Sequence, residues 1–191
     1  TGTTNGLARY DGYQLNTFRT DYKNQNLLTD NGITAINDND LYVWIGTWKG
    51  LNLYNKQTCR ITPFSDARLL DKVVDAITVD KDGNVWVSAG GVIYRCDSTA
   101  HIIKEYEVGN IQEGYAISNI YADQQKQLWA VGSRGIFRYE PETDSFFRYP
   151  PLGNGHTAYI MHQDSSGNYW IGTWGGRFVA ILSQCTERRT L

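Results

Sequence analysis

The stretch ITAINDNDLYVWIGTWKGLNLYNKQT, residues 33–58, decides the fold because close copies of it recur along the chain. Its first tryptophan belongs to a series with intervals of 42, 43 and 41 residues: Trp44, Trp86, Trp129 and Trp170. An aspartate lies six residues before each member of that series: Asp38, Asp80, Asp123 and Asp164. A fixed period of 20 to 50 residues is typical of solenoids, propellers and repeat arrays.

Within one unit the pattern predicts four short strands joined by turns. In the second full repeat these strands are expected at Asp75–Val79, Asn84–Ala89, Gly91–Cys96 and Ile102–Val108. Gly83 stands where a hairpin requires positive φ, and we expect Asp80 to accept hydrogen bonds from the backbone of the same turn. No segment keeps a 3.6-residue period over three turns, so almost no helix is expected.

Four antiparallel strands every ~42 residues predict an all-β chain of β-propeller blades, with the recurrent tryptophans packing between blades. The units divide approximately as a half blade at 1–27, then 28–69, 70–112, 113–154 and 155–191, a single partial propeller over 1–191. Because about four and a half units are few for a closed ring, we expect an open, incomplete one with exposed sheet edges. Such edges favour association, so further blades or a second chain would cover them.

Composition excludes several classes of protein. The 191 residues carry 18 basic and 20 acidic side chains without a basic cluster, which argues against nucleic-acid binding. No apolar run approaches the ~18 residues of a membrane helix, and no export signal is present, so no membrane contact is expected from this segment. Cys59, Cys96 and Cys185 form no metal motif, although a Cys59–Cys96 bridge between neighbouring repeats is left open.

The motifs Trp-Ile-Gly-Thr at 44–47 and Gly-Leu-x-x-Tyr at 50–54 resemble the two-component regulator propeller repeat. Residues 76–95, 117–149 and 159–176 look like further copies, so the resemblance covers essentially the whole chain. It implies the periplasmic sensor region of a hybrid two-component system of the Bacteroidetes type, which commonly detects oligosaccharides. It also implies a membrane helix, a histidine kinase and homodimers in such full-length proteins.

Candidate ligand-binding residues lie in the turn after Trp-Ile-Gly-Thr, where the sequence varies while its frame repeats. Aromatic faces offer apolar surface to sugar C–H groups, and basic side chains bond hydroxyl, sulfate or carboxylate groups. The candidates are Trp48, Lys49, Arg134 and Trp174. Packing of the two tryptophans against a neighbouring blade is the alternative.

No catalytic residue, metal site or cofactor is predicted. The acidic turn at 80–83 lacks the glutamate that a calcium loop needs at its twelfth position, and the histidines show no metal spacing. The favoured hypothesis is a non-catalytic sensor segment that binds oligosaccharides. A propeller enzyme acting on glycans, as a lyase or hydrolase, and a purely structural or protein-interaction propeller remain the alternatives.

Overall fold

The computed structural model describes residues 1–20, 27–108, 117–133, 135–149, 157–174, 178–181 and 189–190, with side chains described up to residue 173. These residues form antiparallel sheets and a single 3-10 turn at Ala67–Leu69. The chain groups into two compact units, which are described separately below. The first comprises Thr1–Gly90 with Tyr94–Lys104, and the second Gly91–Ile93 with Glu105–Leu191.

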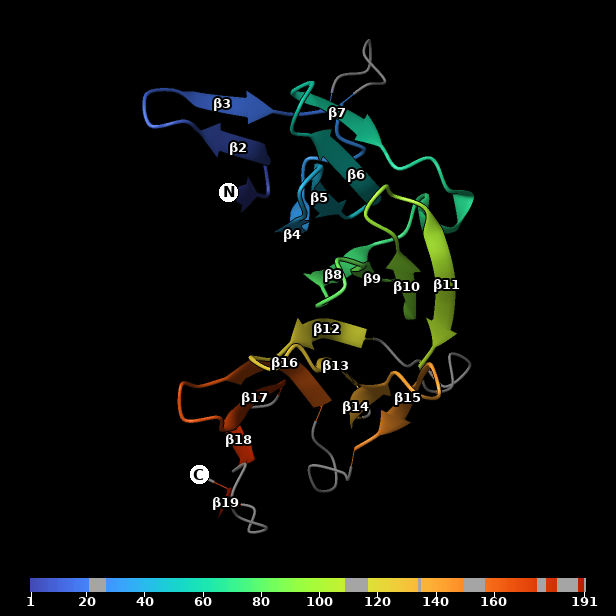
Figure 1. Ribbon diagram of the computed structural model, residues 1–191. Helices are drawn as coiled ribbons and strands as arrows, with labels where there is room; N and C mark the ends of the chain where they lie inside the picture. Colours follow the sequence, from blue (N-terminus) through green and yellow to red (C-terminus); the bar gives the residue numbers. More distant parts are fainter. Residues whose placement is uncertain are drawn as a thin grey trace. The chain divides into compact units, whose positions relative to one another are not determined.

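Five antiparallel sheets follow one another along the chain, and none closes into a barrel (Figure 1). The first has three strands, β1 (Gly2–Thr3), β2 (Gly6–Tyr10) and β3 (Leu15–Phe18). The second has β4 (Ile33–Asp38), β5 (Tyr42–Thr47), β6 (Gly50–Asn55) and β7 (Arg60–Pro63). The third has β8 (Val74–Val79), β9 (Val85–Ala89), β10 (Val92–Cys96) and β11 (Ile102–Glu107).

The remaining two sheets have the same form. One comprises β12 (Ile117–Ala122), β13 (Leu128–Gly132), β14 (Gly135–Glu140) and β15 (Ser145–Arg148). The other comprises β16 (Thr157–Gln163), β17 (Tyr169–Trp174), β18 (Phe178–Ile181) and β19 (Arg189–Thr190). Strands pair in sequence order in every sheet, as in propeller blades. The all-β fold, and the strands of the second full repeat to within one residue, are therefore confirmed.

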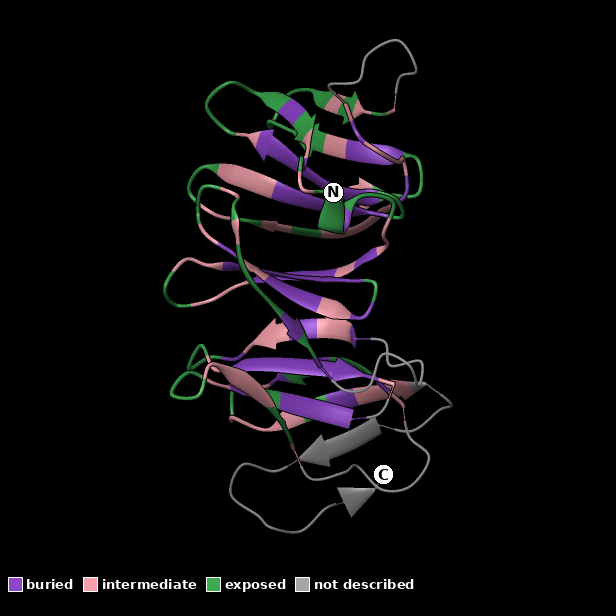
Figure 2. Cartoon of the chain, turned by 90° about the vertical axis from the view of Figure 1, so that its right-hand side faces the viewer, coloured by how far each residue is buried: buried purple, intermediate pink, exposed green. Residues whose placement is uncertain are grey.

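The sheets bury apolar residues on both faces, because one blade packs against the next. Buried positions concentrate in the strands and exposed ones in the turns (Figure 2). In the first unit β8 packs against β4 and β5, and in the second β16 packs against β12 and β13. A core of the second unit contains Trp129, Met161 and Ile171 from adjacent sheets.

The Trp-Ile-Gly-Thr motif is explained by this packing. Trp44 and Ile45 are fully buried. A Cβ on Gly46 would lie 2.7 Å from Cγ1 of Val74 on the next sheet, so only glycine fits there. The Thr47 hydroxyl donates to the carbonyl of Gly50 at 2.8 Å and fixes the turn that follows. The motif is therefore structural, whereas the two residues after it, Trp48 and Lys49, differ between the repeats.

The recurrent aspartates fix the turn between the first two strands of a blade. Asp80 Oδ1 accepts from the backbone of Asp82 and Asn84, and its Oδ2 accepts from Nε1 of Trp86 at 2.8 Å. Asp123 and Asp164 repeat this arrangement with Trp129 and Trp170. Gly83 has a φ of +81°, as the turn chemistry predicts. The pair of aspartate and tryptophan six residues apart is thus one hydrogen-bonded unit.

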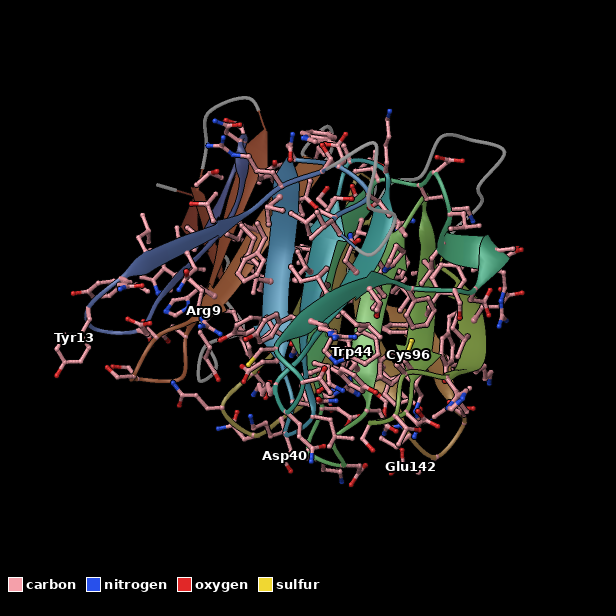
Figure 3. All side chains as sticks on the ribbon, turned by 90° about the horizontal axis from the view of Figure 1, so that it is seen from above. Arg9, Tyr13, Asp40, Trp44, Cys96 and Glu142 are labelled. Carbon is pink, nitrogen blue, oxygen red and sulfur yellow. The ribbon has the colours of Figure 1, made fainter. Side chains whose placement is uncertain are left out.

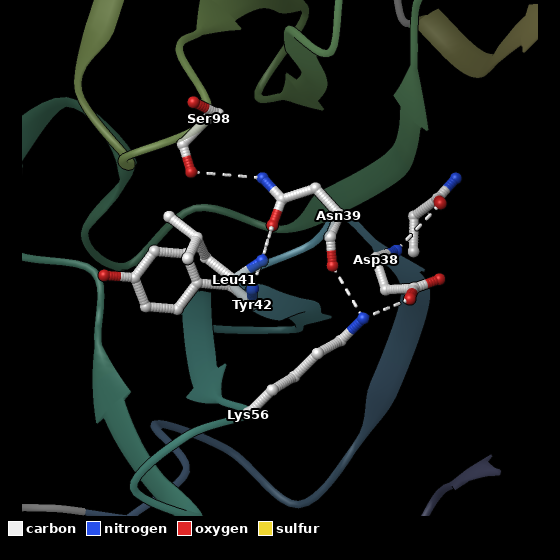
Figure 4. Close-up of polar contacts among 7 residues, drawn as sticks. Asp38, Asn39, Leu41, Tyr42, Lys56 and Ser98 are labelled. Carbon is white, nitrogen blue, oxygen red and sulfur yellow. Dashed lines mark hydrogen bonds and ion pairs between the residues drawn. The ribbon is translucent and has the colours of Figure 1, made fainter.

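Asp38 does not belong to this series, which corrects the sequence-based register. It ends β4, and its carboxylate pairs with Nζ of Lys56 at 2.6 Å (Figure 4). Asn39 takes the turn position instead, where its Oδ1 accepts from the backbone of Leu41 and Tyr42. The turn closes between Asn39 and Tyr42, one residue shorter than the turn between Asp80 and Asn84. The shorter turn leaves Nε1 of Trp44 buried without a hydrogen-bond partner.

The tryptophans differ in burial although their motifs match. Trp44 and Trp86 are buried, and Trp129 lies 5.3 Å, ring to ring, from Tyr169 on the next sheet. Trp170 remains 37% exposed while its indole N–H donates to Asp164. That N–H, followed by the backbone N–H of Asn168, lowers the pKa of Asp164 from 3.8 to about 2.

Candidate functional site

The turn between β5 and β6 carries the candidate residues that the structure describes best. Thr47 pairs with Gly50 across this turn, and Gly50 has a φ of +125°, so only Trp48 and Lys49 form its tip. Trp48 is 56% exposed and Lys49 is also exposed. The turn therefore presents an indole and an ammonium group to solvent.

The indole of Trp48 is held in place by a glycine. The backbone N–H of Trp48 donates to the carbonyl of Gly32 at 3.2 Å. A Cβ at Gly32 would lie only 2.0 Å from Cδ1 and 2.3 Å from Nε1 of Trp48. The ring thus rests against the bare Cα of Gly32, while more than half of the residue stays exposed to solvent.

A carboxylate lies beside this indole. Asp30 Oδ1 accepts from the N–H of Gly32 at 2.7 Å, and the same oxygen is 3.2 Å from the position of a Gly32 Cβ. Among the described residues none donates to the other carboxylate oxygen of Asp30, which remains available as an acceptor. We name Asp30, Gly32, Trp48 and Lys49 the Trp48 site.

A buried polar network joins the two segments of the chain that form the Trp48 site. The hydroxyls of Thr29 and Thr47 lie 3.0 Å apart. Asn52 accepts from the N–H of Thr29 at 3.0 Å and donates to its hydroxyl at 2.9 Å. Thr47 and Asn52 are fully buried. Since every member is bonded, the network fixes the segment before β4 against the β5–β6 turn.

The other candidate residues lie at the equivalent turns, but outside what the structure describes. Arg134 falls outside the described residues, and of Trp174 only the backbone is described, paired with Thr157. In the third sheet the corresponding turn is Gly90–Gly91, which carries no side chain, and the stem of Lys72 lies against Gly90 while Lys72 Nζ bonds the hydroxyl of Tyr94 at 2.9 Å. Binding roles for Arg134 and Trp174 therefore stay predictions.

Sequence reasoning found Trp48 and Lys49 but missed Asp30 and Gly32. Asp30 and Gly32 precede β4 and match no repeat motif. A glycine directly before a strand is a signal that could have been used, because it permits close approach of another group. That the approaching group is the indole of Trp48 was visible only in the structure.

The titratable groups outside the Trp48 site show no catalytic arrangement among the described residues. His101 lies in the exposed turn after β10, with its Nδ1 3.1 Å from the hydroxyl of Thr99 and 3.6 Å from Asp97. No group of His, Cys, Asp and Glu in the described part of the chain is placed to hold a metal ion. No described helix is long and apolar enough to cross a membrane.

The cysteine bridge left open by the sequence is not formed. Cys59 and Cys96 are both free thiols, Cys59 exposed and Cys96 buried. Burial raises the pKa of the Cys96 thiol to about 12. Neighbouring repeats do not bring them together because Cys59 lies in the exposed turn before β7, with a φ of +57°, whereas Cys96 ends the buried strand β10. Cys185 lies outside the described residues.

Asp75 on β8 is a partly buried carboxyl to which no described residue donates a hydrogen bond. Burial raises its pKa from 3.8 to about 6. Because the folded chain holds this proton more tightly than the unfolded chain, ionising Asp75 costs stability as pH rises from about 4 to above 6.

We therefore expect Asp75→Asn to raise Tm at pH 8 by roughly 2–4 °C, the shift that about 1 kcal/mol produces in a domain of this size, after allowing for partial exposure. Below pH 4 the two proteins should have equal Tm. Thermal unfolding by circular dichroism at both pH values checks this. An equal rise in Tm at pH 4 would show that the stabilisation by Asp75→Asn does not come from removing an ionised carboxylate.

Comparison with known proteins identifies the fold through similar solved structures. No family model and no curated protein matches the sequence. Among solved structures, the extracellular domain of the putative hybrid two-component system BT4673 from B. thetaiotaomicron matches 99% of this chain with a TM-score of 0.74 and 19% identity. Catalytically inactive virginiamycin B lyase from Staphylococcus aureus matches 98% with a TM-score of 0.69 and 17% identity. The WD40 propeller domain of Doa1 matches 81% with a TM-score of 0.63 and 18% identity.

These likenesses show the propeller fold. They include the extracellular domain of one putative hybrid two-component system, BT4673, which is of the class that the repeat motif resembles. The chain spans 25% of the BT4673 domain, 63% of the lyase and 52% of the Doa1 domain.

Proposed function

We propose that this chain is a non-catalytic, ligand-binding propeller segment of a two-component signal-transduction protein, and that its ligand is an oligosaccharide. The single observation that carries the proposal is the Trp48 site. An exposed indole, supported from behind by Gly32, lies beside a carboxylate with a spare acceptor and next to a lysine. Sugars require this combination of a flat apolar face with nearby polar groups.

Other features of the chain favour ligand binding over catalysis. A rigid scaffold with variable loops is the usual arrangement for recognition. The likeness to the extracellular domain of a putative hybrid two-component system supports the signalling role and a periplasmic location. Homodimers of the full-length protein and roles for Arg134 and Trp174 complete the proposal. The likeness to a lyase supports the fold alone, and the described histidine with a nearby carboxylate, His101, lies in an exposed turn.

The test is titration calorimetry of the purified chain against a panel of neutral and acidic oligosaccharides. Trp48→Ala should weaken binding of the recognised sugar about tenfold, which corresponds to ~1.4 kcal/mol. Gly32→Ala should have a similar effect, because its Cβ displaces the indole without removing it. Lys49→Ala should weaken acidic sugars selectively, and more so at low salt.

Tyr13→Ala provides the matched control. Tyr13 is 96% exposed in the turn between β2 and β3, where Figure 3 shows it pointing away from the sheets. Its removal deletes an exposed aromatic ring and should leave affinity unchanged. Loss of binding in Tyr13→Ala, retained binding in Trp48→Ala, or steady cleavage of a panel member would overturn the proposal.

A further inference from the structure

The indole N–H of Trp48 has no acceptor among the described residues, unlike that of the repeat tryptophans in the later sheets. Nε1 of Trp86, Trp129 and Trp170 donates to the aspartate six residues earlier, at 2.8, 3.0 and 2.8 Å respectively. Trp48 is more than half exposed. Its N–H is therefore a hydrogen-bond donor that remains available at the Trp48 site.

The carboxylate of Asp30 lies next to that indole but does not bond it. A Cβ at Gly32 would lie 2.3 Å from Nε1 of Trp48 and 3.2 Å from Oδ1 of Asp30, so both atoms lie beside the same point. The N–H of Gly32 donates to Oδ1 at 2.7 Å, which fixes the carboxylate in a local turn. A donor and an acceptor are thus held close together without being paired to each other.

The chemistry of these two groups restricts which ligand group can bond both. An indole N–H only donates, and an ionised carboxylate only accepts. A ligand carboxylate or sulfate would accept from the indole but be repelled by Asp30, and an ammonium would donate to Asp30 but leave the indole unpaired. A hydroxyl serves both, because its oxygen accepts while its hydrogen donates. Two hydrogen bonds of about 2.9 Å each allow one hydroxyl oxygen to join atoms this close together.

The charges of the Trp48 site also favour an uncharged ligand. The site contains one carboxylate, Asp30, and one ammonium group, Lys49, so its formal charges cancel. An anionic sugar therefore gains no net electrostatic attraction from the site as a whole. Lys49 can still donate to a further hydroxyl of a neutral sugar.

We propose that the Trp48 site selects neutral sugars through one hydroxyl group, which accepts from Nε1 of Trp48 and donates to Asp30. This inference rests on the proposed sugar-binding function and narrows its ligand to neutral oligosaccharides. Asp30 is the specificity-determining residue, because its charge attracts the hydroxyl proton and repels anionic sugars. The two bonds strengthen each other, since each polarises the shared hydroxyl.

Titration calorimetry of the 191-residue protein with four trisaccharides tests the preference. Maltotriose, cellotriose and mannotriose are the neutral probes, and trigalacturonate is the acidic probe. At least one neutral probe should bind, and it should bind more tightly than trigalacturonate. This order of affinities needs no substitution, so it tests the proposal even if a variant does not fold.

Asp30→Asn tests the role of the charge. The amide oxygen of asparagine can still accept from the N–H of Gly32, so the local turn is retained. Affinity for the neutral probe should fall about three- to tenfold, because a hydrogen bond to an ionised acceptor is roughly twice as strong as one to a neutral acceptor. Affinity for trigalacturonate should rise or stay the same, because the repulsion is removed.

Trp48→Phe tests the indole N–H, because phenylalanine keeps an aromatic face but lacks the donor. Affinity for the neutral probe should fall about three- to tenfold. Since both substitutions act on the same hydroxyl, the double variant should bind no more than about twofold more weakly than the weaker single variant. Independent contacts would instead multiply the two losses.

Asp40→Asn is the matched control, because it makes the same change of charge away from the site. Asp40 is exposed in the turn between β4 and β5, at the opposite end of β5 from Trp48. Its affinity for every probe should equal that of the unaltered protein. Thermal unfolding of all the variants verifies that they fold.

The possible failures separate this inference from the proposed function. Tighter binding of trigalacturonate than of every neutral probe would overturn the inference, as would an unchanged affinity for the neutral probe in Asp30→Asn. In both cases sugar binding at the Trp48 site would stand. Absence of binding by all three neutral probes would likewise overturn the inference. Neutral-sugar binding that Trp48→Ala leaves unchanged would overturn both proposals.

Discussion

Asp123→Ala is expected to lower the free energy of unfolding of the second unit by about 3–5 kcal/mol, because several donors lose their acceptor and each buried donor left unpaired costs about 1–3 kcal/mol. Asp123 is 3% exposed. Its Oδ1 accepts from the backbone N–H groups of Gln125 and Gln127 at 3.0 and 2.8 Å. Its Oδ2 accepts from Trp129 Nε1 at 3.0 Å and from the Tyr169 hydroxyl at 2.6 Å. Alanine would leave all four donors without this acceptor.

Urea unfolding followed by circular dichroism measures the effect as a lower transition midpoint. Asp164→Ala is the matched control, because Asp164 fixes the same turn around the more exposed Trp170 and has no partner like Tyr169. Its effect should be clearly smaller. If both substitutions shifted the midpoint equally, the turn alone would matter and the link from Asp123 to the next sheet would contribute nothing.

Trp44→Ala is the second substitution with a large expected effect, about 3–5 kcal/mol of unfolding free energy, as for other buried tryptophans. Trp44 is fully buried and contacts the rings of Phe64 and Tyr42. Its Nε1 has no hydrogen-bond partner, so the stabilisation comes from packing. Replacement by alanine leaves a cavity that the surrounding strands fill only in part.

Two comparisons separate packing from polar effects. Trp44→Phe should cost much less than Trp44→Ala, because it retains an aromatic ring and removes an unpaired buried donor. Trp170→Ala should also cost less, since Trp170 is 37% exposed. Equal losses for Trp44→Ala and Trp170→Ala in thermal unfolding would contradict a cost set by burial.

The sequence was sufficient to predict the blades because the period and the strand pattern come from local chemistry. Gly83 needs positive φ, and Asp80 bonds the backbone of its own turn, so both act within a few residues. Such short-range rules need no knowledge of the tertiary structure. The strands of the second full repeat followed from them to within one residue.

Asp38 shows where the same reasoning fails. A count of six residues back from Trp44 gave Asp38, but the turn is one residue shorter and Asn39 occupies the position. Asparagine and aspartate both bond turn backbone, so residue type alone did not separate them. The spacing of Ile36 from Trp44, eight residues instead of nine, was the only sign of the deletion.

The Trp48 site could be predicted only in part, for a related reason. Variation at Trp48 and Lys49 within a repeated frame was visible in the sequence. Asp30 and Gly32 lie on a different segment, which reaches the turn through the buried contacts of Thr29, Thr47 and Asn52. Contacts between segments follow from folding and leave no periodic pattern.

The most direct test of the account is fluorine NMR of the chain labelled with 5-fluorotryptophan, with each of the six tryptophan signals assigned by substitution. Addition of the oligosaccharide selected by calorimetry should shift the Trp48 signal, and by the proposal that of Trp174. The signals of the buried Trp44, Trp86 and Trp129 should stay in place. A ligand that binds without shifting the Trp48 signal would contradict the account.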